Sequence, residues 1–179
     1  MRNLSRALIV ILGLSLAGCV TAPRPSEYRA PAPARAVDME RLYSGRWLEI
    51  ARLPLRLTDG CVAGATNYAV VNATRVNVRD TCQSGTPQGK EKSLSARADI
   101  LDPGFNAKLR VRYLSGLVVW DYWILDHAED YSWYISADPT FDKLWIFTRE
   151  VPDEPELEAL LARAQALGYD VSRLEFPPF

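Results

Sequence analysis

Apolar and polar side chains alternate through most of this chain, and the alternation predicts a series of short β-strands. The clearest case is residues 108–113, in which basic side chains alternate with Leu109, Val111 and Tyr113. Successive side chains of a strand point to opposite faces, so the basic residues face solvent and the other three face a core. We place the remaining strands at residues 45–54, 61–71, 75–79, 92–100, 118–126, 131–136 and 143–149.

Links of hairpin length join these strands, and no helical pattern separates them. Asn72-Ala73-Thr74 and Pro103-Gly104 have the composition of tight turns. Antiparallel strands of this number and length close into a barrel, which removes the exposed edges of an open sheet. The predicted fold class is therefore all-β, an eight-stranded antiparallel up-and-down β-barrel. A β-sandwich is the alternative that the same pattern leaves open.

The period changes near the C-terminus, where the sequence predicts an α-helix packed on the barrel. Asp153 and Glu156 have the spacing of a capping box, and Gly168 marks the end. Apolar residues recur between them at helical spacing, which gives the helix one face to bury against the barrel wall. These residues are Leu157, Leu160, Leu161, Ala164 and Leu167. A last extended piece, residues 171–176, is expected to add to the sheet.

The N-terminus is a targeting segment rather than part of the fold. Arg2 and Arg6 flank a charged n-region, and the apolar run that follows at 7–16 is too short to span a bilayer comfortably. The residues Leu16-Ala17-Gly18-Cys19 follow and resemble a lipobox. This resemblance implies that residues 1–18 are a lipoprotein signal peptide and that Cys19 is acylated. A plain secretory peptide or a short anchor is the alternative.

The next part of the chain, residues 19–37, is rich in proline and alanine and predicts an extended tether. The folded domain is then expected over residues 38–179. Val20, rather than Asp, follows the cysteine, which by analogy with enterobacterial sorting favours the outer membrane. For the lipid-anchored protein we favour the periplasmic leaflet over the cell surface.

Two cysteines, Cys61 and Cys82, remain for the folded domain. In an exported protein such a pair predicts a disulfide, here between neighbouring strands of a hairpin. A reactive thiol pair is the alternative, although no Cys-x-x-Cys spacing supports it.

Charge and composition narrow the chemistry. The formal net charge of −1 gives no reason to expect nucleic acid as a partner. His127 is the single histidine, so a mechanism or metal site that needs two is excluded. We expect His127 on a solvated loop beside Glu129 and Asp130 rather than in an acid–base pair. The sequence contains no Gly-x-Ser-x-Gly, HExxH or Gly-rich phosphate loop, so no catalytic residue, metal or cofactor is predicted.

Two segments carry a family resemblance. Residues 45–54 read Gly-x-Trp followed by Glu-Ile-Ala-Arg and resemble the opening signature of the lipocalins, while residues 144–150 resemble their third signature. The resemblance implies a structural role for Gly45, Trp47 and Arg149, with the arginine packed over the indole to close the barrel base. The second lipocalin signature is absent as such, and Asp126 with residues 130–133 looks like its bacterial variant. Together with the lipobox, this places the nearest likeness among the bacterial outer-membrane lipoprotein (Blc-like) lipocalins, some of which bind fatty acids or lysophospholipids.

Nine residues are expected to face the inside of the barrel. On the strands at 92–100 and 108–113 the charged or polar neighbours must point outward, and for residues 118–126 the opposite register would bury Asp121. The resulting inward set is Leu94, Ala96, Ala98, Leu109, Val111, Tyr113, Trp120, Tyr122 and Ile124. An apolar hollow lined by these residues would suit an acyl chain. The alternative is that they fill a solid core.

The leading functional hypothesis is a membrane-anchored protein that binds, stores or transports small apolar ligands, above all fatty acids or lysophospholipids. Two other classes stay open: an envelope scaffold with a solid barrel, and a lipocalin-type enzyme acting on an apolar substrate. Trp145 or Phe147 on the outer face would favour a partner protein or a homodimer.

Overall fold

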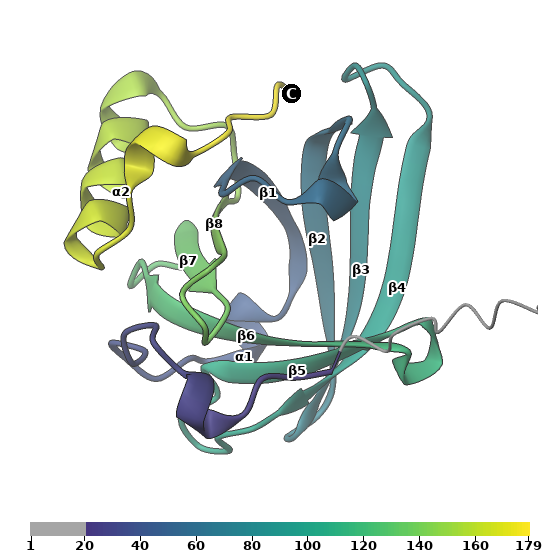
Figure 1. The fold of residues 1–179 in the computed structure, drawn as a ribbon, viewed down its shortest axis with the longest axis vertical. Coiled ribbons are helices and arrows are strands. Elements are labelled where there is room, and N and C mark those ends of the chain that lie inside the picture. Colours follow the sequence, from purple (N-terminus) through teal and green to yellow (C-terminus); the bar gives the residue numbers. More distant parts are fainter. Residues whose placement is uncertain (1–20) are drawn as a thin grey trace, which may run out of the picture.

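The computed structural model describes residues 21–179, and its strands form one closed barrel. Each strand pairs antiparallel with the next in sequence, and β8 returns to pair with β1 (Figure 1). The strands are β1 (Gly45–Arg52), β2 (Cys61–Asn72), β3 (Arg75–Ser84), β4 (Glu91–Ile100), β5 (Lys108–Tyr113), β6 (Val118–His127), β7 (Trp133–Ala137) and β8 (Leu144–Thr148). The predicted eight-stranded barrel is confirmed. The predicted signal peptide 1–18 and the lipidation site Cys19 lie outside the described residues.

Strand β3 extends to Ser84, well beyond the predicted end at residue 79. The extra residues keep their place in the ladder, with Asp80 opposite Leu94 and Cys82 opposite Lys92. The alternation of apolar residues stops after Val78 because the next inward position is an aspartate. The strand itself continues, and it carries this aspartate to the inner face of the barrel.

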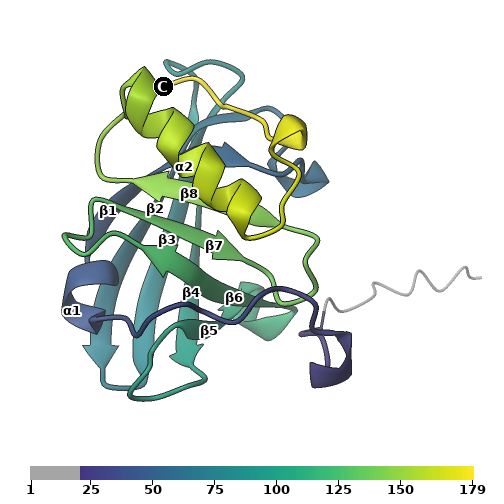
Figure 2. The same ribbon diagram turned by 90° about the vertical axis from the view of Figure 1, so that its left-hand side faces the viewer.

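The helix α2 (Glu154–Ala166) lies outside the barrel against β7 and β8 (Figures 1 and 2). Asp153 caps it: the backbone N–H of Glu156 donates to Asp153 Oδ1 at 2.9 Å. Leu160 and Ala164 are buried in an apolar cluster with side chains from the outer face of the barrel, among them Ile135 and Ile146. Both the helix and its packing face follow the prediction.

Residues 28–37 are extended, as expected for the tether, but they are bound to the barrel wall. The N–H groups of Ala34 and Val37 donate to the carbonyls of Leu125 and Phe105, each at 2.8 Å. Tyr28 packs edge-on against Trp123 with 5.0 Å between ring centres. The segment crosses the outside of the barrel on its way to α1 (Met39–Leu42) (Figure 2). Residues 28–37 therefore cannot serve as part of a free tether, which makes the tether shorter than the predicted 19–37. No helix within residues 21–179 has the length and apolar character needed to cross a membrane.

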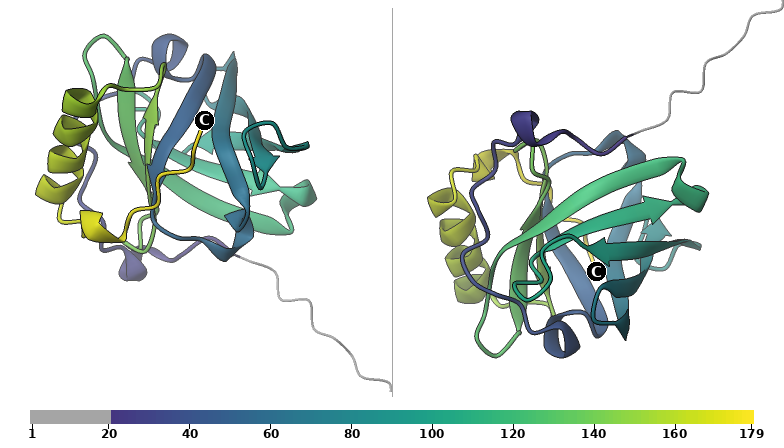
Figure 3. Two further views of the ribbon diagram at one scale, coloured as in Figure 1. Left: turned by 90° about the horizontal axis from the view of Figure 1, so that it is seen from above. Right: turned by 90° about the horizontal axis from the view of Figure 1, so that it is seen from below.

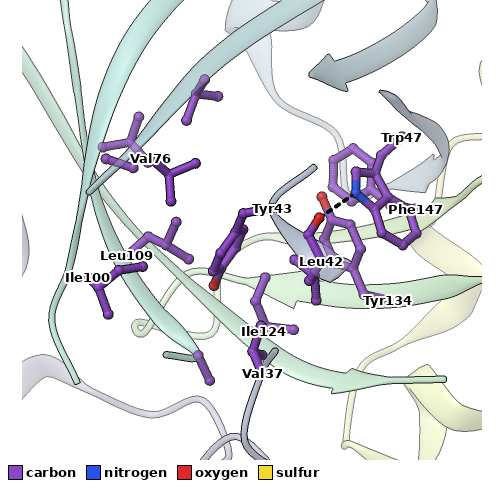
Figure 4. Close-up of a cluster of buried hydrophobic side chains, with 14 of the residues drawn as sticks. Val37, Leu42, Tyr43, Trp47, Val76, Ile100, Leu109, Ile124, Tyr134 and Phe147 are labelled. Atoms are coloured by element: carbon purple, nitrogen blue, oxygen red, sulfur yellow. Dashed lines mark hydrogen bonds between the residues drawn. The ribbon is translucent and has the colours of Figure 1, made fainter. Parts of the chain in front are cut away.

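One end of the barrel is sealed by α1 and the residues after it. Asp38 caps this short helix, and Leu42 and Tyr43 are fully buried. The indole Nε1–H of Trp47 donates to the carbonyl of Leu42 at 2.8 Å (Figure 4). Figure 4 also shows Tyr43 between this indole and the apolar side chains of the far wall, such as Val76. This end of the interior is a packed core.

Arg149 lies over Trp47, with its guanidinium carbon 3.5 Å from the ring centre. It donates hydrogen bonds to the carbonyls of Ser44 at 2.8 Å, Arg46 at 3.0 Å and Arg41 at 2.9 Å. Gly45 lies between these carbonyls with a φ of +61°, and a Cβ there would approach Arg149 Nη1 to 3.6 Å. A positive φ is readily adopted by glycine, so Gly45 allows the chain to turn beneath the guanidinium.

Cys61 and Cys82 form a disulfide, with 5.4 Å between their Cα atoms. It joins the first residue of β2 to the end of β3, so the predicted pairing within a hairpin is confirmed.

Two sequence expectations about polar residues were wrong. His127 is the last residue of β6 and is buried: its Nε2 lies 3.1 Å from the carbonyl of Ala36 and its Nδ1 2.8 Å from that of Ala128. Asp121 is buried although it faces outward, because Arg110 donates two hydrogen bonds of 2.8 Å to its carboxylate. Ion pairing, rather than exposure, keeps Asp121 outside the barrel.

The C-terminal residues contribute less to the sheet than predicted. Residues Val171–Arg173 form a 3-10 turn, and one isolated bridge joins Glu175 to Arg52 of β1. Farther along the tail, the N–H of Ala63 in β2 donates to the carbonyl of Pro178 at 2.8 Å, so the tail meets the barrel at two separate points rather than along a ladder.

We predict that Arg149→Lys lowers the free energy of unfolding by about 2 kcal/mol, because lysine cannot stack on Trp47 and donate to three carbonyls at once. Chemical denaturation of both proteins measures the loss. Arg79→Lys is the matched control, since Arg79 makes only an exposed pair with Glu91. Equal losses in the two variants would show that Arg149 is an ordinary surface cation.

Candidate functional site

The other end of the barrel is open and leads to a cavity of about 330 Å³. Residues of the β1–β2 and β5–β6 connections, including Leu55, Thr58 and Leu114, line its mouth. Trp120, Trp145 and Phe147 contribute to its walls. Figure 3 shows the ring of strands along the barrel, with α2 outside it. Ligand sites in proteins span roughly 300–1,000 Å³, so this volume suits one small ligand.

The nine residues predicted to face inward all belong to the inner cluster or pack against it. Five of them line the cavity: Leu94, Val111, Tyr113, Trp120 and Tyr122. The other four pack in the sealed part of the interior: Ala96, Ala98, Leu109 and Ile124. Ala98 is fully buried beside residues such as Val76, so it borders no open space.

Trp145 and Phe147 also face the cavity and are 5% and 6% exposed. Their neighbours Leu144 and Ile146 point outward and are covered by the cluster beneath α2. Neither aromatic residue is therefore available on the outer surface. Their position gives no support to a homodimer or to a docking site for a partner protein.

Four charged side chains line the cavity: three lie within it, Glu49, Arg52 and Asp80, and the fourth, Lys92, is exposed at its mouth. Glu49 and Arg52 are three residues apart yet share the inner face, because a β-bulge between Glu49 and Ala51 reverses the alternation. Arg52 Nη1 donates to Glu49 Oε1 at 2.7 Å, and Arg52 Nε donates to Glu175 at 3.3 Å. The sequence pattern did not indicate any of the three as cavity residues.

The Glu49 side chain is only 14% exposed. Burial raises its pKa from the ordinary 4.5 to about 7, and the attraction of Arg52 offsets this only in part. Near neutral pH the Glu49 carboxyl group is therefore protonated in part of the molecules.

Asp80 is held by hydroxyl groups. Its Oδ1 accepts from Thr66 Oγ1 at 2.7 Å, and its Oδ2 accepts from the Tyr113 hydroxyl at 2.8 Å. Burial raises the pKa of Asp80, and these two hydrogen bonds oppose that effect. Burial also raises the pKa of Tyr113 and Tyr122 well above the ordinary value, so their hydroxyls stay protonated and act as donors.

Within residues 21–179 no three His, Cys, Asp or Glu side chains come together in a group that could hold a metal ion. The cavity combines apolar walls with a few charged side chains that are ion-paired or hydrogen-bonded. Its arrangement is that of a binding pocket with a few fixed polar groups.

A family model described as a lipocalin-like domain matches residues 37–179. Temperature-induced lipocalin-1 of Arabidopsis thaliana is 30% identical over 153 residues, which cover 80% of this chain and 80% of that protein. Outer membrane lipoprotein Blc of Vibrio cholerae is 24% identical over 172 residues, covering 94% and 96%. Among solved structures, insecticyanin from the tobacco hornworm Manduca sexta superposes with a TM-score of 0.62 at 18% identity, covering 85% of this chain and 87% of that one.

We predict that Glu49→Gln removes a pH dependence of stability. Because the pKa of Glu49 is raised on folding, the native state loses stability as pH rises from about 4.5 to about 7. The free energy of unfolding of the variant relative to the unmodified protein should therefore increase by about 2–3 kcal/mol between pH 4.5 and pH 8.

Urea denaturation at these two pH values measures the change. Glu91→Gln, which removes a half-exposed carboxylate on the outer face, is the matched control. A difference that stays constant with pH would mean that folding does not raise the pKa of Glu49.

Proposed function

Since this chain is a member of the lipocalin family, we propose that it takes up single-chain lipids, fatty acids or lysophospholipids, in the open half of its barrel. The observation that carries the proposal is the cavity of about 330 Å³ that opens at one end and has aromatic and aliphatic walls. Each CH₂ group moved from water into such a cavity contributes about 0.8 kcal/mol. The apolar walls of the cavity therefore suit an acyl tail better than a polar ligand.

This volume also argues against a scaffold with a solid barrel. The packed core ends around Tyr43 and Trp47, and the walls beyond it face open space. Lipocalins are in general binding and transport proteins, which favours binding over catalysis here.

Membrane anchoring through Cys19 is the second part of the proposal, and it rests on the order of charge, apolar run and cysteine in the sequence. Outer membrane lipoprotein Blc of Vibrio cholerae, which is similar over nearly its whole length, supports the outer membrane as the location. On this proposal residues 1–18 are removed and the acyl chains hold the protein in the periplasmic leaflet.

The path of the described N-terminus favours transfer between the membrane and the cavity. Thr21 and Pro23 lie beside Trp120 and the β7–β8 connection at Pro139, close to the open end. Cys19 precedes Thr21 by two positions, so an anchor there would keep the mouth near the membrane surface. Leu114 and Leu117 are exposed on the β5–β6 connection at this end and present apolar side chains to the lipid.

We predict that Leu94→Trp weakens binding of lysophospholipid or fatty acid about tenfold or more, because the indole occupies the cavity that the tail would fill. Titration followed by native mass spectrometry measures the loss. Ser95→Trp, one residue along β4 on the outer face, is the matched control and should bind like the unmodified protein. Equal affinity in all three proteins would place the lipid outside the barrel.

We predict that Cys19→Ser moves the protein from the membrane to the soluble fraction, because several acyl chains are needed for stable anchoring. Metabolic labelling with palmitate and fractionation of cells expressing the full chain measure both losses. Val20→Asp is the matched variant: it should keep the label and move from the outer to the inner membrane. Continued labelling of the serine variant would refute the lipidation site.

A further inference from the structure

Asp80 is a carboxylate in the cavity that has no cationic partner among the described residues. Its two oxygens are bound by neutral hydroxyls, from Thr66 and Tyr113. The ion pairs within residues 21–179 do not include it. Asp80 therefore contributes an uncompensated negative charge to an apolar space whenever it is ionised.

The cations that share the cavity make no ion pair with Asp80. Arg52 is bound to two carboxylates, those of Glu49 at 2.7 Å and Glu175 at 3.3 Å. Lys92 is exposed at the mouth, where it lies opposite Cys82 rather than opposite Asp80, and it makes no ion pair in the described chain. Apart from Lys92 at the mouth, the ionised cavity therefore holds two carboxylates, Glu49 and Asp80, and one cation, Arg52.

An ionised carboxylate in such surroundings is costly unless a proton or a cation joins it. The walls beside it suit a cation, because the negative faces of aromatic rings attract positive charge. Trp120 lies with its ring centre 6.1 Å from that of Tyr113 and 6.2 Å from that of Tyr122, and Tyr122 lies 5.1 Å from Trp145. Aromatic faces and one free carboxylate therefore occur in the same cavity.

We propose that the ligand of this cavity carries a positively charged amine, which pairs with Asp80 while its apolar chain fills the aromatic part. The inference rests on the proposed function and narrows it to cationic amphiphiles. A fatty-acid anion would bring a second negative charge towards Asp80, so it is the less favoured single-chain ligand. A charged hydrogen bond between an ammonium group and a carboxylate is short and about twice as strong as a neutral one.

Three probes with the same ten-carbon tail test the charge: n-decylamine, 1-decanol and decanoate. Each displaces a neutral fluorescent probe, N-phenyl-1-naphthylamine, from the chain expressed from Val20 onward. This chain contains the barrel, both apolar clusters and α2, and it carries no acyl group that competes for the cavity. We expect decylamine to bind about tenfold more tightly than decanol, and decanoate to bind most weakly.

The variant Asp80→Asn identifies the residue responsible. It should reduce decylamine affinity about tenfold, remove the preference over decanol, and leave decanol affinity unchanged. Unchanged decanol binding also shows that the variant has kept its folded cavity. Asp99→Asn, which removes a carboxylate from the outer face of β4 beside Arg75, is the matched control and should alter none of the three affinities.

The outcomes separate this inference from the function on which it rests. Equal binding of decylamine and decanol, or a preference for decylamine that survives in Asp80→Asn, would overturn the inference while leaving apolar binding in place. Failure of all three probes, with Leu94→Trp behaving like the unmodified protein, would overturn the proposed function itself.

Discussion

The contact between Arg149 and Trp47 holds together parts of the chain that are far apart in sequence. The guanidinium lies 3.5 Å from the centre of the indole ring and donates to the carbonyls of Arg41, Ser44 and Arg46. It thus joins the residue after β8 to the residues that lead into β1, where the barrel closes on itself. The indole in turn donates to Leu42, so the same contact keeps α1 over one end. A cavity open only at the opposite end is the result.

Sealing one end divides the interior into a packed half and a hollow half, and the two halves tolerate different residues. The packed half contains Leu42, Tyr43 and Ala98, all fully buried. The hollow half contains Glu49 and Asp80, whose pKa values are raised by burial and whose oxygens accept hydrogen bonds from neighbouring side chains. Charged groups remain there because each has specific hydrogen-bonding partners.

Alternation along the sequence was enough to predict the barrel, the outer helix and most inward positions. The alternation gave no correct prediction where both faces of a strand are apolar, where a polar residue faces inward, or where a bulge shifts the register. On β8 both faces are apolar, one towards the cavity and one beneath α2, so the orientation of Trp145 could not be deduced. On β3 an inward Asp80 ended the pattern before the strand ended. The bulge in β1 lies in an uninterrupted segment and left no signal that Arg52 faces inward.

The bonds that fix residues 28–37 lie one after another along the barrel wall, and this order has a mechanical consequence. Ala30 binds Pro139, Ala34 binds Leu125 and Val37 binds Phe105. A force applied at the N-terminus would load these hydrogen bonds one at a time, beginning with the bond to Pro139. The strand ladder would carry no tension until the last of them had opened. A pull on the N-terminus would therefore lengthen this segment before it could deform the barrel.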